Sequence, residues 1–388
     1  MSEWKEYCIT DVCDTISETY KDGAKKVVLI NTSDVLEGKI TNHKFVDNNN
    51  LAGQFKKKFQ KDDILYSEIR PANRRYAYVD IEPKDYIAST KLMVLRNKPC
   101  ILPKYLYYLL TNNSTIRELH AIAVGRSGTF PQITYSELSN IKFRLPPIEK
   151  QERILSILLN IDSKIENNRK ICANLEAQAQ ALFKHWFIDF APFKDGKFVE
   201  SELGMIPEGW RVGSILDIAE LYDYQRKPLS SMEREDMKGD YPYYGATSIM
   251  DYIDKYIFDG TYVLMGEDGS VVKDNGCPYL QYVWGKFWPN NHAHVMQGKN
   301  GFSTEMLYCF LSITDVRSIV TGAVQMKISQ RSMSHLLTVI PSKSVCGDYN
   351  RIIRPLFDLI KSTKEENDRL STLHDTLLPK LMSGEIKV

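Results

Sequence analysis

The chain has 388 residues, 43% of them hydrophobic and 26% charged, which is typical of folded protein with room for two cores of about 150 residues each. Its 50 Lys and Arg residues are balanced by 49 Asp and Glu residues, which argues against a protein that coats nucleic acid by bulk charge. The sequence has no secretory pattern, no apolar run of membrane-spanning length and no paired pattern among its seven cysteines. We therefore expect a cytoplasmic protein without a membrane partner, a disulfide framework or a zinc site.

Residues 1–144 are expected to form a first globule in which short strands alternate with helices. Strands are predicted at 27–30, 64–66 and 91–95, and Pro103 marks the start of a helix. Basic side chains are grouped around aromatic and Asn residues, which suits contact with phosphates and base edges, at Lys56, Lys57, Lys58, Arg70, Arg74 and Arg75. The alternative is a solvated loop in which these charges only keep the domain soluble.

The segment 125–132 is a second candidate binding loop in this globule. Its glycines allow close approach of the backbone to a ligand, and Arg126, Thr129 and Gln132 can donate hydrogen bonds to phosphates or bases. A plain surface turn is the alternative. The spacing of Thr134 and Glu137 predicts a capping box, so a short helix is expected to follow.

Residues 145–190 are predicted to form a long central helix. After the Pro146-Pro147 pair, apolar residues recur at alternating steps of four and three, with one polar exception. The positions of this seam are Ile154, Leu158, Ile161, Ile165, Asn168, Cys172, Leu175, Ala179 and Leu182. A helix whose seam extends over roughly 48 Å needs a partner helix to cover that seam.

The partner is predicted in residues 343–388, because the chain repeats itself. An offset of 198 carries the seam onto Ile352, Leu356, Leu359, Thr363, Glu366, Leu370, Leu373, Leu377 and Lys380. Upstream pairs such as Trp4 and Trp210 keep the same order, which indicates an internal repeat of globule and helix. Asn168 then falls opposite Glu366, where it would fix the register of the helices; the alternative is that both side chains are hydrated at the edge of the bundle.

The second globule, residues 208–342, follows a connector at 191–207 that has no sustained periodicity. Glu267 and Asp268 would point to opposite faces of a strand, and His292 and His294 have no third ligand nearby, so a metal site is not expected. Structural or DNA-facing histidines are favoured instead.

Candidate contacts to nucleic acid in the second globule are polar, basic or aromatic. They are Tyr243, Tyr244, Lys273, Asn290, Asn291, His292, Lys327, Gln330 and Arg331, although tyrosines more commonly pack in a core or at its rim. The stretch 322–331 occupies the place of the 125–132 loop in the first half. We therefore predict that the two loops face a common ligand.

Several stretches resemble the specificity subunits of type I restriction-modification enzymes. They are the connector SELGMIPEGW at 201–210, together with 145–154, 174–183 and the ending at 377–386. Blocks at 243–246, 266–269 and 291–294 resemble motifs of the second-type recognition domains in that family. The similarity extends over essentially the whole chain.

The resemblance implies an α/β (α+β) fold with two target-recognition domains, at 1–144 and 208–342, separated by two long helices packed as an antiparallel coiled coil with a pseudo-two-fold internal repeat. It also implies a non-catalytic reader of double-stranded DNA, in which each domain reads one half of a bipartite, asymmetric site. Two methyltransferase (M) subunits would dock on the helices, and restriction (R) subunits would join them. This chain would need no cofactor, while S-adenosylmethionine, ATP and Mg would act in the partner subunits.

Two other readings remain open at this point. An independent enzyme is disfavoured because the chain lacks a Gly-rich cofactor loop after a strand, an Asn-Pro-Pro-Tyr motif and a GxxxxGK[ST] phosphate loop. A coiled-coil scaffold without DNA readout would use the same helical seam. A salt-dependent, sequence-selective shift of DNA would separate the DNA reader from the scaffold.

A ruler role for the helices is testable. Half-sites read from one face of DNA lie about one turn, or about 34 Å, apart, and the predicted helix is long enough to set that distance. Insertion of one heptad after Asn168 is expected to lengthen the unspecified spacer of the DNA site without changing either half-site. An altered half-site with an unchanged spacer would contradict the ruler role.

Overall fold

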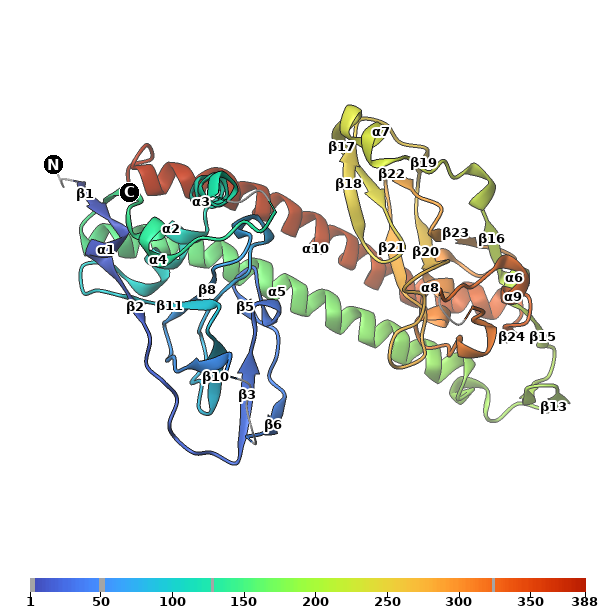
Figure 1. The fold of residues 1–388 in the computed structure, drawn as a ribbon. Helices are drawn as coiled ribbons and strands as arrows, with labels where there is room; N and C mark the ends of the chain where they lie inside the picture. Colours follow the sequence, from blue (N-terminus) through green and yellow to red (C-terminus); the bar gives the residue numbers. More distant parts are fainter. Residues whose placement is uncertain (1–3, 49–52, 127–128, 323–324) are drawn as a thin grey trace. The chain divides into compact units, whose positions relative to one another are not determined.

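The computed structural model describes residues 4–48, 53–126, 129–322 and 325–388, and its ribbon is shown in Figure 1. The chain divides into two compact units, and both ends of the sequence belong to the first of them. Unit 1 comprises Met1–Glu166 with Asn367–Val388, and unit 2 comprises Asn167–Glu366. Within the described residues, no helix is both long and apolar enough to cross a membrane.

Unit 1 contains two four-stranded sheets, drawn in blue and cyan in Figure 1. The first has the order β6 (Phe45–Asp47), β3 (Lys26–Ile30), β10 (Tyr86–Ser89) and β7 (Phe55–Lys57); the second has the order β2 (Cys13–Ile16), β11 (Leu92–Asn97), β8 (Ile64–Ser67) and β9 (Tyr76–Tyr78). Only β3 and β10 are parallel neighbours among the described strands of these two sheets. Apolar and β-branched residues of β3, β8 and β11 share one core cluster, which joins the two sheets, as strand propensity predicts.

Unit 2 repeats this topology strand for strand. Its sheets have the orders β18 (Ile249–Ile253), β17 (Lys238–Tyr244), β22 (Lys286–Pro289), β19 (Phe258–Asp259) and β16 (Ala219–Leu221), β23 (Ala293–Gly298), β20 (Tyr262–Gly266), β21 (Leu280–Val283). Again the second and third strands of the first sheet, β17 and β22, are parallel, and the other described pairings are antiparallel. The predicted internal repeat is therefore confirmed at the level of strand order and direction.

Shorter elements complete each unit. In unit 1 they are β1 (Lys5–Cys8) paired with β12 (Lys142–Leu145), β4 (Val35–Leu36) paired with β5 (Lys39–Ile40), and the helical segments α1 (Ile9–Val12), η1 (Thr32–Asp34), η2 (Pro71–Asn73), α2 (Pro103–Thr111), α3 (Asn113–Arg126) and α4 (Tyr135–Ser139). In unit 2 they are β13 (Phe198–Ser201) with β14 (Gly204–Pro207), β15 (Arg211–Ser214) with β24 (Leu337–Ile340), η3 (Ala191–Phe193), α6 (Ile215–Ile218), η4 (Asp223–Gln225), α7 (Ser231–Asp236), α8 (Thr304–Ser312), η5 (Arg317–Ile319) and α9 (Gln330–Met333). The β13–β14 hairpin lies in the stretch that the sequence marks as a connector.

Two long helices, α5 (Ile148–Phe187) and α10 (Lys343–Ser383), contribute to the core of both units. The predicted seam of α5 is confirmed by burial: Ile154, Leu158, Ile165, Asn168, Cys172, Leu175 and Ala179 are buried, and Ile161 and Leu182 are half-buried. Early residues of α5 contact late residues of α10 in unit 1, and the reverse holds in unit 2, as the bonds from Asn367 Nδ2 to Ile165 O (3.3 Å) and from Tyr349 Oη to Ala179 O (3.3 Å) illustrate. The helices therefore pack antiparallel.

The predicted seam of α10 is wrong at four of its nine positions, Ile352, Leu359, Leu373 and Lys380, which are exposed. Ile352, Leu359 and Leu373 are 43%, 48% and 45% exposed, whereas Ile353 and Ile360 are fully buried. The observed seam contains Cys346, Tyr349, Ile353, Leu356, Ile360, Thr363, Asn367, Leu370, His374, Leu377 and Leu381. The spacing between these residues begins with a step of three, whereas the predicted seam begins with a step of four. Packing within unit 2 decides which face of α10 is buried: the ring centroids of Tyr349 and Phe187, for example, lie 4.9 Å apart. A fixed offset from α5 does not carry that information.

Asn168 and Glu366 meet inside unit 2 as the repeat predicts. Asn168 is 1% exposed, and its Nδ2 donates a hydrogen bond to Glu366 Oε2 at 2.7 Å. A buried amide bonded to a carboxylate is not a hydrated group at the edge of a bundle, so that alternative is wrong for Asn168. Nearby, Lys364 Nζ and Glu176 Oε1 form an ion pair at 2.9 Å between the two helices.

The neighbouring residues Ile352 and Ile353 give a matched test of the observed register. Ile353→Ala is expected to lower the free energy of unfolding by about 2–5 kcal/mol, because it leaves a cavity in a closed core. Ile352→Ala is expected to change the free energy of unfolding by about 0.5 kcal/mol or less, because its side chain is exposed. Chemical denaturation of both variants checks the register, and equal effects would contradict it.

Candidate nucleic-acid interface

In unit 1, the turn after β8 lies beside the segment that precedes α4. Ile69 and Gln132 form a β-bridge, Arg70 N donates to Pro131 O at 3.0 Å, and Ile133 N donates to Glu68 O at 2.9 Å. The structure thus brings together two segments that the sequence marked separately. We name them loop pair 1, residues 68–73 and 129–134.

In unit 2, the turn after β20 is joined to the segment before α9 in the same way. Asp268 and Lys327 form a β-bridge, Gly269 N donates to Met326 O at 3.0 Å, and Ile328 N donates to Glu267 O at 2.8 Å. We name these segments loop pair 2, residues 267–270 and 325–331. Because each bond has a counterpart in loop pair 1, the prediction that the two loops occupy matching positions in their halves is confirmed.

Each loop pair leads into a short capped helix. Glu137 accepts hydrogen bonds from the backbone N–H and the side chain of Thr134, and these bonds lower the pKa of Glu137. Ser329 takes the same place before α9, where its hydroxyl accepts a hydrogen bond from Ser332 N at 3.0 Å. The caps fix where each loop ends and each helix begins.

The predicted contacts of the first half differ in their availability. Arg70 is exposed, with a left-handed φ of 45°, Thr129 is exposed and Gln132 is half-buried. Arg126 is exposed and forms an ion pair with Glu137, the capping residue of α4. These four residues belong to loop pair 1 or are tied directly to it.

Arg74 and Arg75, which are predicted as contact residues, are half-buried and each form a hydrogen bond within unit 1. Arg74 Nη2 donates to Asn113 Oδ1 at 2.6 Å, and Arg75 Nη1 donates to Ser33 O at 3.0 Å. Both side chains thereby hold the η2 turn against its neighbours. Arg117, one helical turn after Asn113 on α3, is exposed; its position follows from the i, i+4 spacing but was not predicted.

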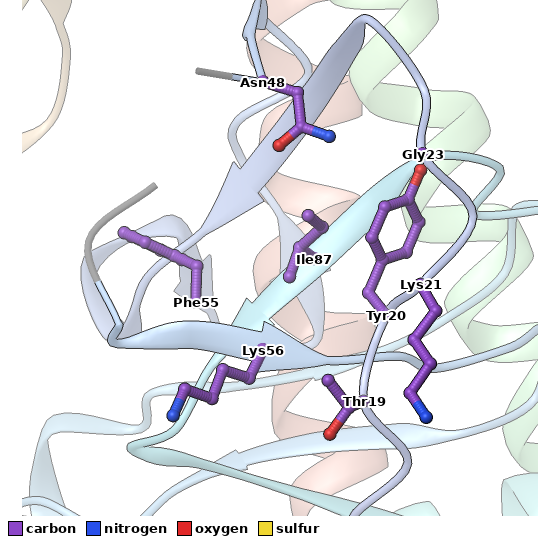
Figure 2. A pocket seen from close by; sticks show the side chains of 8 residues that line it. All are labelled: Thr19, Tyr20, Lys21, Gly23, Asn48, Phe55, Lys56 and Ile87. Atoms are coloured by element: carbon purple, nitrogen blue, oxygen red, sulfur yellow. The ribbon is translucent and has the colours of Figure 1, made fainter. Parts of the chain in front are cut away.

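Of the three consecutive lysines predicted as contacts, Lys56 and Lys57 lie on β7 and Lys58 follows it directly. Lys57 Nζ donates to Leu92 O at 2.7 Å, and burial lowers the pKa of Lys57. Lys58 Nζ pairs with Asp22 Oδ2 at 2.9 Å, and its hydrogen bond to Asp22 raises the pKa of Lys58. Lys56 is exposed and lines a hollow of about 250 Å³ with Lys21 (Figure 2). Lys56 is exposed, whereas Lys57 and Lys58 are half-buried.

Two predicted contacts of the second half lie in the core and are corrected. Tyr243 is 1% exposed, its hydroxyl accepts a hydrogen bond from Leu229 N at 3.0 Å, and the guanidinium of Arg234 lies 5.1 Å from its ring centroid. Asn290 is 3% exposed, and its Oδ1 accepts a hydrogen bond from His292 N at 2.8 Å. Both are structural residues.

The remaining predicted residues of the second half lie nearer the surface. Tyr244 is half-buried and packs edge-on against Phe287, with ring centroids 5.7 Å apart. The exposed residues are Lys273, Asn291, His292, Lys327, Gln330 and Arg331. His292 Nδ1 contacts Asp268 Oδ1, which joins the 290–294 block to loop pair 2.

Behind loop pair 2, buried and half-buried polar and charged side chains form a network that reaches the exposed residues Lys327 and Gln330. His294 Nδ1 lies 2.6 Å from Asp223 Oδ2, which also accepts from Gln330 Nε2 at 2.6 Å. Arg226 Nη1 donates to Glu267 Oε2 at 2.7 Å, and Glu267 Oε1 pairs with Lys327 Nζ at 3.2 Å. Residues so far apart in sequence give no local pattern, so sequence reasoning did not identify Asp223 or Arg226.

Asp223, Glu267 and His294 lie close enough to hold a metal ion, but their bonding favours another arrangement. His294 Nε2 lies 2.7 Å from Ile328 O, which can only accept a hydrogen bond, and Nδ1 faces Asp223. Nε2 therefore carries a proton and presents no lone pair to a metal. Burial would raise the pKa of Asp223, but the hydrogen bond and charge of His294, with the bonds from Gln330 and Val295 N–H, lower it below its usual range.

Comparisons with known proteins agree with this geometry. A family model described as the type I restriction modification DNA specificity domain matches residues 1–177 and 207–372. The HindI type I restriction enzyme specificity subunit of Haemophilus influenzae is 29% identical over 469 residues, covering 100% of both chains. The MjaIX specificity subunit of Methanocaldococcus jannaschii is 26% identical over 350 residues, covering 85% of this chain and 79% of that relative.

Among solved structures, the crystal structure of the S subunit of a type I restriction-modification system from M. genitalium has the same fold. The TM-score is 0.53 at 17% identity, and the match covers 98% of this chain and 96% of that chain. At this identity the likeness concerns the fold.

The ionised state of Asp223 predicts a specific acid sensitivity. Its pKa is lower in the folded than in the unfolded chain, so the stability it contributes is present at neutral pH and is lost as the pH falls through the folded-state pKa. In Asp223→Asn, the free energy of unfolding is expected to fall less steeply with acidification than in the wild type. Denaturation at a series of pH values checks this, with Asp274→Asn, at an exposed position, as control. Identical slopes in wild type and Asp223→Asn would contradict it.

Proposed function

We propose a function for this chain from the premise that it belongs to the type I restriction-modification DNA specificity family. It reads duplex DNA in a sequence-specific manner, and each unit reads one half of a bipartite, asymmetric site. The observation that carries this proposal is the pair of equivalent loop arrangements, one in each unit. Two copies of one geometry with different side chains suit two half-sites of different sequence.

The chemistry of the loop pairs supports base readout by side chains. The backbone groups of residues 68–70, 131–133, 267–269 and 326–328 bond to one another, which stiffens the loops. The side chains that remain exposed include donors suited to purine edges, because Arg pairs with guanine and Asn with adenine in the major groove. They are Arg70 and Thr129 in unit 1, and Asn291, His292 and Arg331 in unit 2.

Contacts to phosphates would come from exposed basic residues around the loop pairs. Arg117 and Arg126 flank loop pair 1, and Lys273 follows loop pair 2 in sequence. Such contacts fix position without reading sequence, so they add affinity for every DNA site alike. The nearly neutral charge of the whole chain requires this local arrangement.

The chain acts without catalysis of its own and directs partner subunits to DNA in the cytoplasm. Two methyltransferase subunits dock along the long helices, restriction subunits join them, and S-adenosylmethionine, ATP and Mg act in those partners. Ile352 and Leu359 support docking on α10, because two large apolar side chains seven residues apart project from one helix face, 43% and 48% exposed.

The proposal predicts a methylation pattern that depends on this gene. Modification-sensitive long-read sequencing of the host genome is expected to show a split motif with methylated adenines in both halves, and this methylation should vanish on deletion of the gene. Complementation with Arg70→Ala should relax one position of the first half-site by about 1–3 kcal/mol if Arg70 reads a guanine. Methylation unchanged by the deletion would favour the coiled-coil scaffold instead.

A further inference from the structure

The hairpin formed by β17 and β18 brings a further segment of unit 2 to the candidate interface (Figure 1). The two strands pair antiparallel with Tyr244 opposite Ile249, and Gly245 N donates to Ser248 O at 2.8 Å, which closes a tight turn. We name residues 245–250 the hairpin tip. It overlaps a block that the sequence singled out, yet it belongs to neither loop pair.

The hairpin tip lies directly beside loop pair 2. Asn290 N donates to Tyr244 O at 2.9 Å, which joins the hairpin to the 290–294 block that also contacts loop pair 2. A Cβ atom at Gly266, the residue before loop pair 2, would lie 3.7 Å from Ala246 O. Three separate stretches of the sequence therefore meet at one end of unit 2.

Met250 belongs to the hairpin tip and is held in place by two neighbours. Its Sδ accepts a hydrogen bond from Asn290 Nδ2 at 3.3 Å, and Asn290 is only 3% exposed. The Met250 side chain also lies against Gly245, because a Cβ atom at Gly245 would approach Met250 Sδ to 2.7 Å. Met250 is nevertheless 54% exposed. A large apolar side chain is thus positioned at the surface without being covered.

The hairpin tip combines this apolar group with hydroxyl groups. Thr247 and Ser248, at the turn, are both exposed. The major groove of DNA presents one apolar group, the C5-methyl group of thymine, among the hydrogen-bond donors and acceptors of the base edges. A thioether beside two hydroxyl groups on a narrow turn is complementary to that mixture of chemistry.

Unit 1 has a different connection at the equivalent place. Its strands β3 and β6 take the positions of β17 and β18 in the sheet order. They are joined by residues 31–44, which include η1, β4 and β5, where unit 2 has a tight turn. The two units therefore share their strand order, but within the described residues only unit 2 carries this hairpin tip.

We propose that the hairpin tip is a third DNA-reading segment of unit 2, in which Met250 reads the C5-methyl group of a thymine in the half-site of that unit. This inference rests on the proposed DNA-reading function and adds a contact that the loop pairs do not supply. Contact between the methyl group and Met250 removes apolar surface of both from water. Cytosine carries only hydrogen at C5, so one position of the half-site should prefer thymine.

The test begins with selection of a randomised duplex library by the full-length chain, together with the subunits that copurify with it. Each thymine of the selected site is then replaced singly by deoxyuridine, which pairs like thymine but lacks the C5-methyl group. The wild type is expected to bind one of these duplexes roughly fourfold more weakly, which is the effect of burying one methyl group. Met250→Ala should bind that duplex and the thymine duplex equally well.

Met232→Ala is the matched control. Met232 is 78% exposed on α7, which precedes the end of β17 that is remote from the hairpin tip. This variant should keep the wild-type dependence on the methyl group, whereas Gly245→Ala should reduce it, because the added Cβ displaces the flexible Met250 side chain. The inference is overturned if Met250→Ala keeps the full dependence at every thymine, or if Met232→Ala loses it equally.

Photochemical crosslinking locates the contact in the wild-type protein. 5-Iododeoxyuridine at the sensitive thymine places the reactive iodine where the methyl group stood, so the crosslinked peptide should contain residues 245–250. A crosslink to unit 1 would contradict the assignment. A selected site without any methyl-sensitive thymine overturns this inference alone, whereas failure of the wild type to select any sequence overturns the proposed function together with it.

Discussion

Each unit of this protein depends on the antiparallel packing of α5 against α10, because neither core is complete without residues from both helices. In unit 1, Ile154 and Leu158 of α5 pack in one cluster with Leu378 and Leu381 of α10. In unit 2, residues 172–187 of α5 and 346–360 of α10 share a cluster with the sheet formed around β20 and β23. The helices are therefore parts of the domains and not only a connection between them. Burial of apolar surface on this scale is the dominant favourable term in folding.

This arrangement explains how a duplicated chain can carry two different surfaces. The strand order, the parallel pair in each first sheet and the bonds within each loop pair are the same in both units, so the backbone presents its loops in the same way twice. The exposed side chains differ: Arg70 and Thr129 have no identical counterparts in loop pair 2. A change in those side chains would alter the DNA sequence that is recognised, while the core keeps the loops in place. Functional residues commonly vary in this way on loops that a conserved fold holds in position.

The sequence predicted those features that depend on local periodicity or on repetition. The seam of α5 follows from the spacing of apolar residues, and the equivalence of the two loops follows from the repeat. The register of α10 could not be predicted in the same way, since Ile352 and Ile353 are equally apolar and only packing on unit 2 decides which is buried. Tyr243 and Asn290 look like ligand contacts because their side chains are polar, yet each forms its hydrogen bonds inside the core. Asp223 and His294 are 71 residues apart, and no local pattern connects them.

The most direct test of the account is photochemical crosslinking of the assembled complex to its DNA site, followed by identification of the crosslinked peptides. The account predicts crosslinks in both units, at residues 68–73 and 129–134 and at residues 267–270 and 325–331, with each pair linked to a different half of the site. Crosslinks confined to one unit, or located on the long helices and absent from both loop pairs, would contradict it.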